Sequence, residues 1–260
     1  MTPDVVVDVG NSRVKWGRVR KGRIVAQSAF PHDNPVGWKR TAQEWKLRRE
    51  DVWIVAGVHP KQVLRVVDWI RSRTARCHVL DTSSFLKIAP KLGLTLDVEK
   101  PERVGIDRLL SATSAMKRTR SNVPLVVITV GTAMTVDFLD GTRRFLGGAI
   151  LPGPRLMARS LKKHTAKLPL IDLLPALPTN VWGRNTKEAM ALGIASAVLG
   201  SADQLVWDFA KTLPTPPHVV LTGGDFEYFR GYVFTADVHG ITFVPELTLD
   251  GLRLAAAALP

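Results

Sequence analysis

An internal repeat in this chain of 260 residues narrows the choice of fold more than its composition does. Residues 5–14 (VVVDVGNSRV) align without a gap with residues 126–135 (VVITVGTAMT). In both copies an apolar, β-branched run ends in a glycine and a short polar residue, and a second run follows. β-branched residues favour strands, and glycine favours tight turns. The repeat therefore predicts two similar lobes, each with a strand–turn–strand element, facing each other across a cleft.

The segments around the repeat predict alternating strands and helices. We expect strands at residues 14–19, 23–28, 52–58, 77–80 and 219–221. We expect helices at residues 60–73, 101–117 and 186–213, and from residue 249 onward. This mixture predicts an α/β protein.

The composition is that of a folded protein, and its net charge is strongly positive. Hydrophobic residues make up 45% of the chain, and no apolar run reaches the roughly 20 residues that a membrane span needs. The single cysteine, Cys77, leaves no intramolecular disulfide, so a reducing cytoplasm is the expected compartment. The net charge of +13 favours anionic partners. The basic residues are dispersed without interleaved aromatic residues, however, so we favour solvated basic faces over nucleic-acid binding.

The two predicted turns have the chemistry of phosphate-binding sites. A glycine lets the backbone approach a ligand closely, and its amide can point outward. Asn11, Ser12 and Thr132 add side-chain donors, and Lys15 adds a positive charge. Asp8 stands at the end of a strand, where it could hold Mg²⁺ directly or through water. A single strand–glycine turn is usually only a hairpin, but two such turns together with Asp8 favour the phosphate interpretation.

A glycine pair follows the last predicted strand. Gly223 and Gly224 lie between residues 219–221 and a predicted helix, where they would let an adenosine lie flat against the backbone. The alternative is a plain helix-entry turn in which Asp225 serves as the N-cap. The two phosphate turns in the same chain favour the nucleotide interpretation.

The sequence Gly105-Ile106-Asp107-Arg108 falls inside the helix predicted at residues 101–117. A glycine inside a helix costs about 1 kcal/mol relative to alanine, so its presence indicates close approach of a ligand or of a neighbouring helix. Asp107 could then take the proton of an attacking hydroxyl, as the base does in kinase reactions. The alternative is an exposed Asp107–Arg108 pair, which would contribute little.

Taken together, these motifs resemble one family: the type III pantothenate kinases of the acetate kinase, sugar kinase, Hsp70 and actin superfamily. The motifs are residues 8–12 (DVGNS), 105–108 (GIDR), 131–137 (GTAMTVD), 147–153 (GGAILPG), 165–169 (TAKLP), 183–186 (GRNT), 222–224 (TGG) and 247–252 (LTLDGL). The resemblance implies two related lobes of the actin-like (ribonuclease H-like) fold, each a mixed five-stranded sheet flanked by helices, with the nucleotide cleft between them. The N-terminal lobe would span residues 1–118 and hold the first turn and Asp107. The C-terminal lobe would span residues 119–260 and hold the second turn and the adenosine-binding glycines.

The resemblance also implies an activity. A kinase of this family transfers a phosphoryl group from ATP to the terminal hydroxyl of pantothenate, giving 4'-phosphopantothenate in the first step of coenzyme A biosynthesis. The resemblance implies Asp107 as the catalytic base, Mg²⁺ held by Asp8, a monovalent cation (K⁺ or NH₄⁺), and an obligate homodimer that completes the substrate site at its interface. The implied ATP-binding residues are Asp8, Val9, Gly10, Asn11, Ser12, Arg13, Val14, Lys15, Thr132, Gly223 and Gly224. The implied pantothenate-binding residues are Val98, Gly105, Ile106, Asp107, Arg108 and Thr186.

Two positions depart from the family pattern. Thr129 stands where the family usually has the aspartate that binds the monovalent cation, so that site is weakened or absent here. Val98 stands where the family usually has a tyrosine against pantothenate, and the loss of a ring and a hydroxyl should lower affinity. These departures favour a catalytically weak paralogue with a regulatory or ligand-binding role. The retained residues favour the enzyme; they are Asp8, Asp107, Thr132 and Thr186. We therefore expect an active kinase.

Overall fold

The computed structural model describes residues 1–74, 76–172 and 181–259, which form two compact units. The first unit comprises residues 1–120, 143–145 and 246–260, and the second comprises residues 121–142 and 146–245. The prediction from the sequence places residues 246–260 in the C-terminal lobe, whereas the structure places them in the first unit. The physical reason is that the last helix buries its apolar side against the sheet of the first unit.

The first unit is built on a sheet with the strand order β3-β2-β1-β4-β5. Its strands are β1 (Val5–Val9), β2 (Val14–Arg20), β3 (Arg23–Phe30), β4 (Trp53–Gly57) and β5 (Cys77–Val79). Neighbours among β1, β2 and β3 are antiparallel, whereas β4 is parallel to β1 and β5 is parallel to β4. Every residue of β1 is buried, which is typical of a central strand in a sheet covered on both faces.

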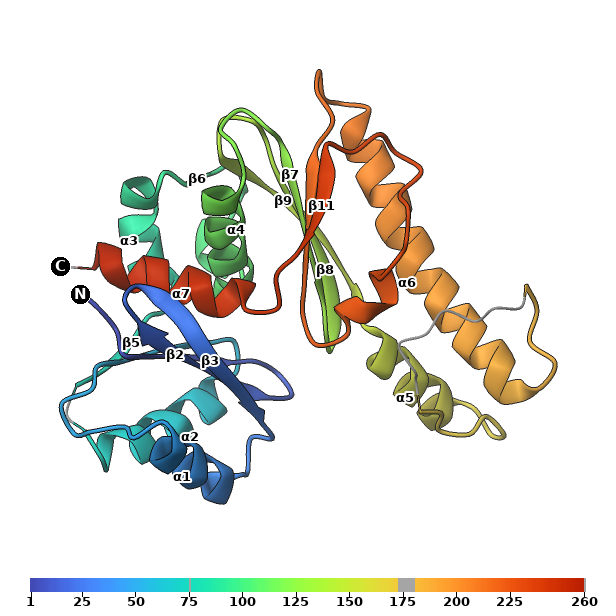
Figure 1. The fold of residues 1–260 in the computed structure, drawn as a ribbon. Helices are drawn as coiled ribbons and strands as arrows, with labels where there is room; N and C mark the ends of the chain where they lie inside the picture. The colour runs from blue at the N-terminus through green and yellow to red at the C-terminus, as the bar shows by residue number, and fades with distance from the viewer. Residues whose placement is uncertain (75, 173–180, 260) are drawn as a thin grey trace. The chain divides into compact units, whose positions relative to one another are not determined.

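Helices cover both faces of the first sheet (Figure 1). They are α1 (Pro35–Glu44), α2 (Pro60–Arg71), α3 (Thr82–Leu92), α4 (Ile106–Arg118) and α7 (Leu247–Ala258). α1 and α2 cover one face, where Val5, Val7 and Val9 contribute to a tryptophan-rich core. α7 covers the other face, with Leu249 next to Gly17 of β2. Because side chains alternate along a strand, Asp8 shares the α7 face.

The second unit repeats the topology of the first. Its strands are β7 (Leu125–Val130), β8 (Ala133–Leu139), β9 (Arg144–Pro152), β10 (His218–Thr222) and β11 (Gly240–Phe243), in the order β9-β8-β7-β10-β11. The first two residues of β9, Arg144 and Phe145, fall in the first unit. β7 takes the place of β1, with β8 antiparallel to it and β10 parallel. A two-residue strand, β6 (Thr95–Leu96), pairs with Arg144 and Phe145 and makes this a six-stranded sheet, so the prediction of five strands in each lobe is wrong for the second sheet. A two-residue strand carries too little pattern to be predicted.

Two helices and a 3₁₀ turn complete the second unit: α5 (Pro154–His164), α6 (Thr186–Ala210) and η2 (Phe226–Phe229). Among the described residues, α6 is the one helix long and apolar enough to cross a membrane, with a mean hydropathy of 1.4 in its most apolar window. Its residues Ile194, Val198 and Val206 are buried in the core of the second unit. The core helix of a folded domain passes the same test, and we interpret α6 as one.

Candidate active site

The first predicted phosphate turn is a four-residue connection between β1 and β2. Val9 pairs with Val14, and the Gly10 N–H donates to the Arg13 carbonyl at 3.0 Å, which closes the turn. Asn11, Ser12 and Arg13 are exposed at its tip. The turn therefore has the hairpin geometry that the repeat predicted, with its backbone open to a ligand.

Neighbouring segments hold this turn from two sides. The Val58 N–H donates to the Val9 carbonyl at 3.1 Å, and a Cβ on Gly57 would lie 2.5 Å from the same oxygen, so glycine is required for this close approach. On another side, His32 Nε2 lies 2.9 Å from the Gly10 carbonyl oxygen. His32 was not predicted from the sequence, because a lone histidine after a strand carries no recognisable signal.

Asp8 and Lys15 stand directly opposite each other on β1 and β2. Asp8 is buried, and its Oδ1 atom has no hydrogen-bond partner within the described part of the chain. Loss of solvent raises the pKa of the Asp8 carboxyl from 3.8 to about 6, while the Lys15 ammonium opposes the shift and Asp107 adds to it. A buried oxygen without a partner is unusual, and it is a sign of a missing ligand.

Asp107 lies in the first turn of α4, on the same side of the first unit as Asp8. The Arg108 N–H donates to its Oδ1 at 2.9 Å, so the carboxylate caps the amino end of its own helix. Burial raises the pKa of Asp107, and the Arg108 N–H and the charges of Arg108 and Lys15 oppose the rise. The half-buried carboxylate is therefore poised for proton transfer.

The prediction that Gly105 lies inside a helix is wrong. The predicted helix is divided into a 3₁₀ turn, η1 (Pro101–Arg103), and α4, and Gly105 is the N-cap between them. Its φ of −56° suits any residue, so the requirement for glycine is one of space. A Cβ at this position would lie 2.6 Å from Asp107 Oδ1. Gly105 thus leaves room for the Asp107 carboxylate. The sequence-based explanation for this glycine was close approach of a ligand or of a neighbouring helix.

The other substrate residues predicted near Asp107 surround the start of α4. Ile106 is buried, and the guanidinium of Arg108 lies 5.7 Å from the centre of the Phe145 ring. Val98 lies, partly buried, in the bend between β6 and η1. The first unit thus brings together Asp8, Lys15, Gly105 and Asp107, with Arg108 beside them.

The second predicted turn joins β7 to β8 and is shorter than the first. Val130 pairs with Met134, and the Gly131 N–H donates to the Ala133 carbonyl at 3.0 Å. Because the second turn is one residue shorter, the gap-free alignment of the repeat matches residues that are not structurally equivalent after the glycine. A Cβ on Gly153 would lie 1.9 Å from the Gly131 carbonyl oxygen, and the Gly153 N–H donates to the Thr132 carbonyl at 3.0 Å.

The glycine pair lies beside this turn in the second unit. Gly223 has a φ of +104°, and a Cβ there would lie 2.1 Å from the Val130 carbonyl oxygen. Gly224 is exposed, with open space around its Cα. Asp225 is the N-cap residue of η2, as the alternative interpretation expected, but its side chain makes no capping hydrogen bond. Its carboxylate instead accepts hydrogen bonds from the Arg155 guanidinium at 2.9 and 3.0 Å.

Thr129 lies in a row of threonines across three strands. It pairs with Thr135 on β8 and with Thr222 on β10. The Thr135 hydroxyl donates to the fully buried Asp137 carboxylate at 3.1 Å. Position 129 itself offers only a neutral oxygen. Asp137 was given no role from the sequence, since a single carboxylate within a strand gives no signal on its own.

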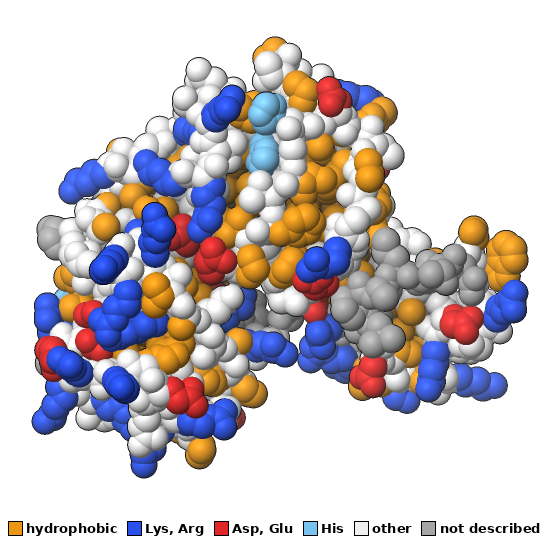
Figure 2. Space-filling model, viewed as in Figure 1, with side chains coloured by type: hydrophobic (Ala, Val, Ile, Leu, Met, Phe, Trp, Pro, Cys, Tyr) orange, Lys and Arg blue, Asp and Glu red, His pale blue; other side chains and the backbone are white. Residues whose placement is uncertain are grey.

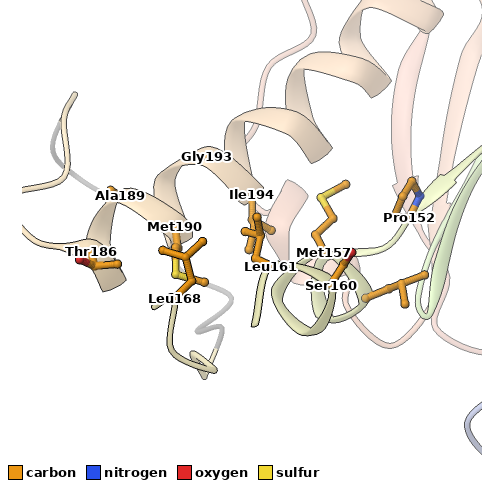
Figure 3. A pocket seen from close by; sticks show the side chains of 11 residues that line it. Pro152, Met157, Ser160, Leu161, Leu168, Thr186, Ala189, Met190, Gly193 and Ile194 are labelled. Atoms are coloured by element: carbon orange, nitrogen blue, oxygen red, sulfur yellow. The ribbon is translucent and has the colours of Figure 1, made fainter. Parts of the chain in front are cut away.

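Thr186 is exposed at the start of α6 and lines an apolar groove of about 770 Å³ between α5 and α6 (Figure 3). The groove is formed by Leu156, Met157, Leu161, Leu168, Met190 and Ile194, among others. Thr186 belongs to the second unit, whereas the Asp8–Asp107 cluster belongs to the first.

Asp8 is the residue by which the site could hold a divalent metal ion. The described residues contain no group of three or more His, Cys, Asp or Glu side chains that could hold a metal ion by themselves. A single buried carboxylate oxygen without a partner suits Mg²⁺, which keeps several waters and takes one or two carboxylates together with substrate phosphates.

A family model of the type III pantothenate kinases matches residues 5–208. This chain belongs to the type III pantothenate kinase family. The type III pantothenate kinase of Akkermansia muciniphila is 30% identical over 253 residues, which cover 97% of both chains. That of Desulfotalea psychrophila is 30% identical over 274 residues, which cover 98% of both chains.

Proteins outside this family have a similar fold. A solved archaeal actin homologue superposes over 100% of both chains with a TM-score of 0.53 at 10% sequence identity. That likeness shows the fold alone, and with the two repeated sheets it confirms the prediction of a two-lobed, actin-like fold. As a member of the type III pantothenate kinase family, the chain thus carries the fold that its repeat indicated.

Proposed function

We propose that this chain transfers the γ-phosphoryl group of ATP to the terminal hydroxyl of pantothenate, the first step of coenzyme A biosynthesis. The observation that carries the proposal is the Asp8–Lys15–Asp107 cluster, in a chain that aligns with type III pantothenate kinases over nearly its whole length. Kinase chemistry needs a base, a metal ligand and a cation near the phosphates, and the cluster supplies one residue for each role.

Asp107 would act as the general base. Its carboxylate accepts the proton of the pantothenate hydroxyl as that oxygen attacks the γ-phosphorus atom, and the raised pKa brings its basicity closer to what the reaction requires. Ile106, Arg108 and Gly105 would line the pantothenate site, with Val98 at its edge. The Arg108 guanidinium has the charge to attract the pantothenate carboxylate.

Asp8 and Lys15 would act on the phosphates. A bound Mg²⁺ would supply positive charge that offsets the negative charge developing on the phosphates. Asp8 would hold that ion, directly or through water, and Lys15 would attract the phosphates to the first turn. We assign the exposed backbone of residues 10–13 and Thr132 to phosphate binding, and Gly223 and Gly224 to the adenosine.

We infer a homodimer that is formed through the groove between α5 and α6. The groove lining is almost entirely apolar and therefore suits a protein surface better than an anionic acid such as pantothenate. The groove also contains Thr186, which family resemblance assigns to pantothenate. A second copy of this chain packed here would carry Thr186 to the substrate site of its partner.

The monovalent cation has weaker support. Thr129 and its neighbours Thr135 and Thr222 offer neutral hydroxyls, without the formal negative charge of the aspartate that the family usually has at position 129. We therefore derive no step through a monovalent cation. We expect turnover to depend weakly on K⁺ or NH₄⁺.

We place the enzyme in the cytoplasm, without a membrane or nucleic-acid partner. Support comes from the packing of α6 in the core, the single buried cysteine and the function of coenzyme A biosynthesis. Lys and Arg side chains are scattered over the face seen in Figure 2 rather than gathered in one stripe, which favours solvated basic surfaces.

The decisive experiment is a phosphoryl-transfer assay with pantothenate, ATP and Mg²⁺, with and without K⁺, on the wild type and Asp107→Asn. The variant should lose at least about 100-fold in turnover while it keeps its affinity for ADP. The matched control is Glu102→Gln, an exposed carboxylate in η1, which should leave turnover unchanged. Near wild-type turnover of Asp107→Asn would remove Asp107 from its role as base. A wild type that binds ADP but makes no phosphopantothenate would favour the regulatory paralogue.

A further inference from the structure

His32 lies outside the predicted motifs, and its side chain makes a hydrogen bond to the first phosphate turn. It follows β3, two residues beyond Phe30, and its Nε2 lies 2.9 Å from the Gly10 carbonyl oxygen. A carbonyl oxygen only accepts hydrogen bonds, so Nε2 must carry the proton in this contact. His32 is therefore a donor to the backbone of the turn.

A second histidine braces the ring of His32. His59 is the N-cap residue of α2, and its ring centre lies 5.6 Å from that of His32 in an edge-to-face arrangement. The backbone of the preceding residue, Val58, donates to the Val9 carbonyl. The β4–α2 junction thus supports the turn directly through Val58 and indirectly through the two rings.

The hydrogen bond to Gly10 determines the orientation of a whole peptide group. The Gly10 carbonyl and the Asn11 N–H belong to one planar, trans peptide unit and point in opposite directions. Holding the carbonyl toward His32 therefore aims the Asn11 N–H away from His32, in a turn whose residues 11–13 are exposed. Glycine at position 10 could otherwise adopt many backbone conformations, so a fixed peptide here depends on outside contacts.

We propose that His32 is a positioning residue for the nucleotide: its Nε2–H fixes the Gly10–Asn11 peptide so that the Asn11 N–H is preorganised to bind a nucleotide phosphate. The inference rests on the proposed function, because it takes the first turn as a phosphate site. His32 itself does not touch the reacting atoms. It acts by lowering the entropy that the turn would lose on binding.

Two substitutions separate this role from a structural one. His32→Phe keeps a ring that can pack against His59 but removes the donor, whereas His32→Gln keeps an N–H donor of similar reach. In calorimetric titrations with ADP, His32→Phe should bind about tenfold more weakly, and His32→Gln should stay close to the wild type. In the kinase assay the KM for ATP should rise in His32→Phe, with the KM for pantothenate unchanged. His78→Phe, at an exposed histidine on β5, is the matched control and should change neither constant.

The outcomes separate the inference from the proposed function. If His32→Phe binds ADP as tightly as the wild type, the inference is overturned even in an active kinase. If both His32 variants lose affinity equally and melt earlier, the histidine is structural and the inference also fails. A wild type inactive on pantothenate would end the proposed function, yet selective loss of ADP binding in His32→Phe would still support the role of His32. Absence of ADP binding by the wild type would overturn both.

Discussion

At the scale of single residues, Asp8 combines a stability cost with the metal-binding role that we propose for it. Its carboxylate is buried in the first sheet, its Oδ1 has no partner among the described residues, and its pKa is raised to about 6 by desolvation. The charged form that would bind Mg²⁺ is therefore the form that the folded protein disfavours. Buried groups with shifted pKa values are concentrated at active sites for this reason.

The raised pKa predicts that Asp8→Asn stabilises the protein at high pH. Well below its unfolded pKa of 3.8, Asp8 is protonated in both folded and unfolded chains, so its ionisation costs nothing. Between pH 3.8 and about 6 the unfolded chain ionises Asp8 while the folded chain keeps it protonated, so a penalty builds up that levels off above about pH 6 at up to about 3 kcal/mol. The substituted amide never ionises, so the advantage of the variant in free energy of unfolding should grow between about pH 4 and pH 7, while turnover is lost.

Urea unfolding at the two pH values measures this difference. Asp68→Asn, at an exposed aspartate on α2, is the control and should show the same difference at both. An advantage of Asp8→Asn that does not change between the two pH values would contradict the raised pKa.

At the scale of secondary structure, the missing Cβ of Gly105 leaves space for the Asp107 carboxylate at the start of α4. We predict that Gly105→Ala lowers turnover at least about tenfold, because the new methyl group would meet Asp107 Oδ1 at 2.6 Å and displace the carboxylate. The melting temperature should change little, since a φ of −56° is open to alanine. Steady-state kinetics and thermal unfolding measure the two effects.

A second glycine substitution provides the control. Gly200 lies inside α6, and a Cβ added there would meet no neighbouring side chain within 4 Å, so Gly200→Ala should leave turnover unchanged. It should also stabilise the helix by about 1 kcal/mol. Equal turnover in Gly105→Ala and Gly200→Ala would mean that the carboxylate of Asp107 does not depend on the space at Gly105.

Much of the fold could be predicted from the sequence because the repeat lies in two buried central strands. β-branched runs such as Val5–Val9 mark those strands, and both glycines do begin turns. The helix start at Ile106 was mispredicted because Pro101 is a typical first residue of a helix, and here it opens a 3₁₀ turn instead. The alignment of the two repeats did not reveal that the second turn is shorter. A small change in turn length alters which residues of the two strands pair, but it does not alter the residue types in the segment.

The site could be predicted only where a residue type carries its own chemistry. Carboxylates at Asp8 and Asp107 and the glycine turns satisfy that condition. The contacts of His32 and Asp225 depend on which segments the fold brings together, and the sequence around them contains no repeated pattern. The proposed reacting groups could thus be named from the sequence, whereas the contacts of His32 and Asp225 could not.

At the scale of the whole molecule, the proposed dimer can be tested through its groove. We predict that Leu156→Glu, at a residue 41% exposed on α5, converts the dimer to a monomer, because a carboxylate cannot be buried in an apolar interface without a partner. Turnover should fall with dissociation, since Thr186 would no longer reach the partner's site. Sedimentation velocity measures the change.

The control is Leu64→Glu, at a residue 64% exposed on α2 in the first unit, which should remain dimeric. A wild type that sediments as a monomer, or a Leu156→Glu variant that stays dimeric, would place the interface elsewhere or remove it.

The position of α7 also has a consequence for biosynthesis. A ribosome makes β1 long before α7, yet the two pack together in the first unit. Until α7 emerges, the apolar side of β1 that carries Val6 lacks its covering helix. The first sheet therefore cannot be completed before α7 has been made, and we expect the nascent chain to need protection by chaperones until then.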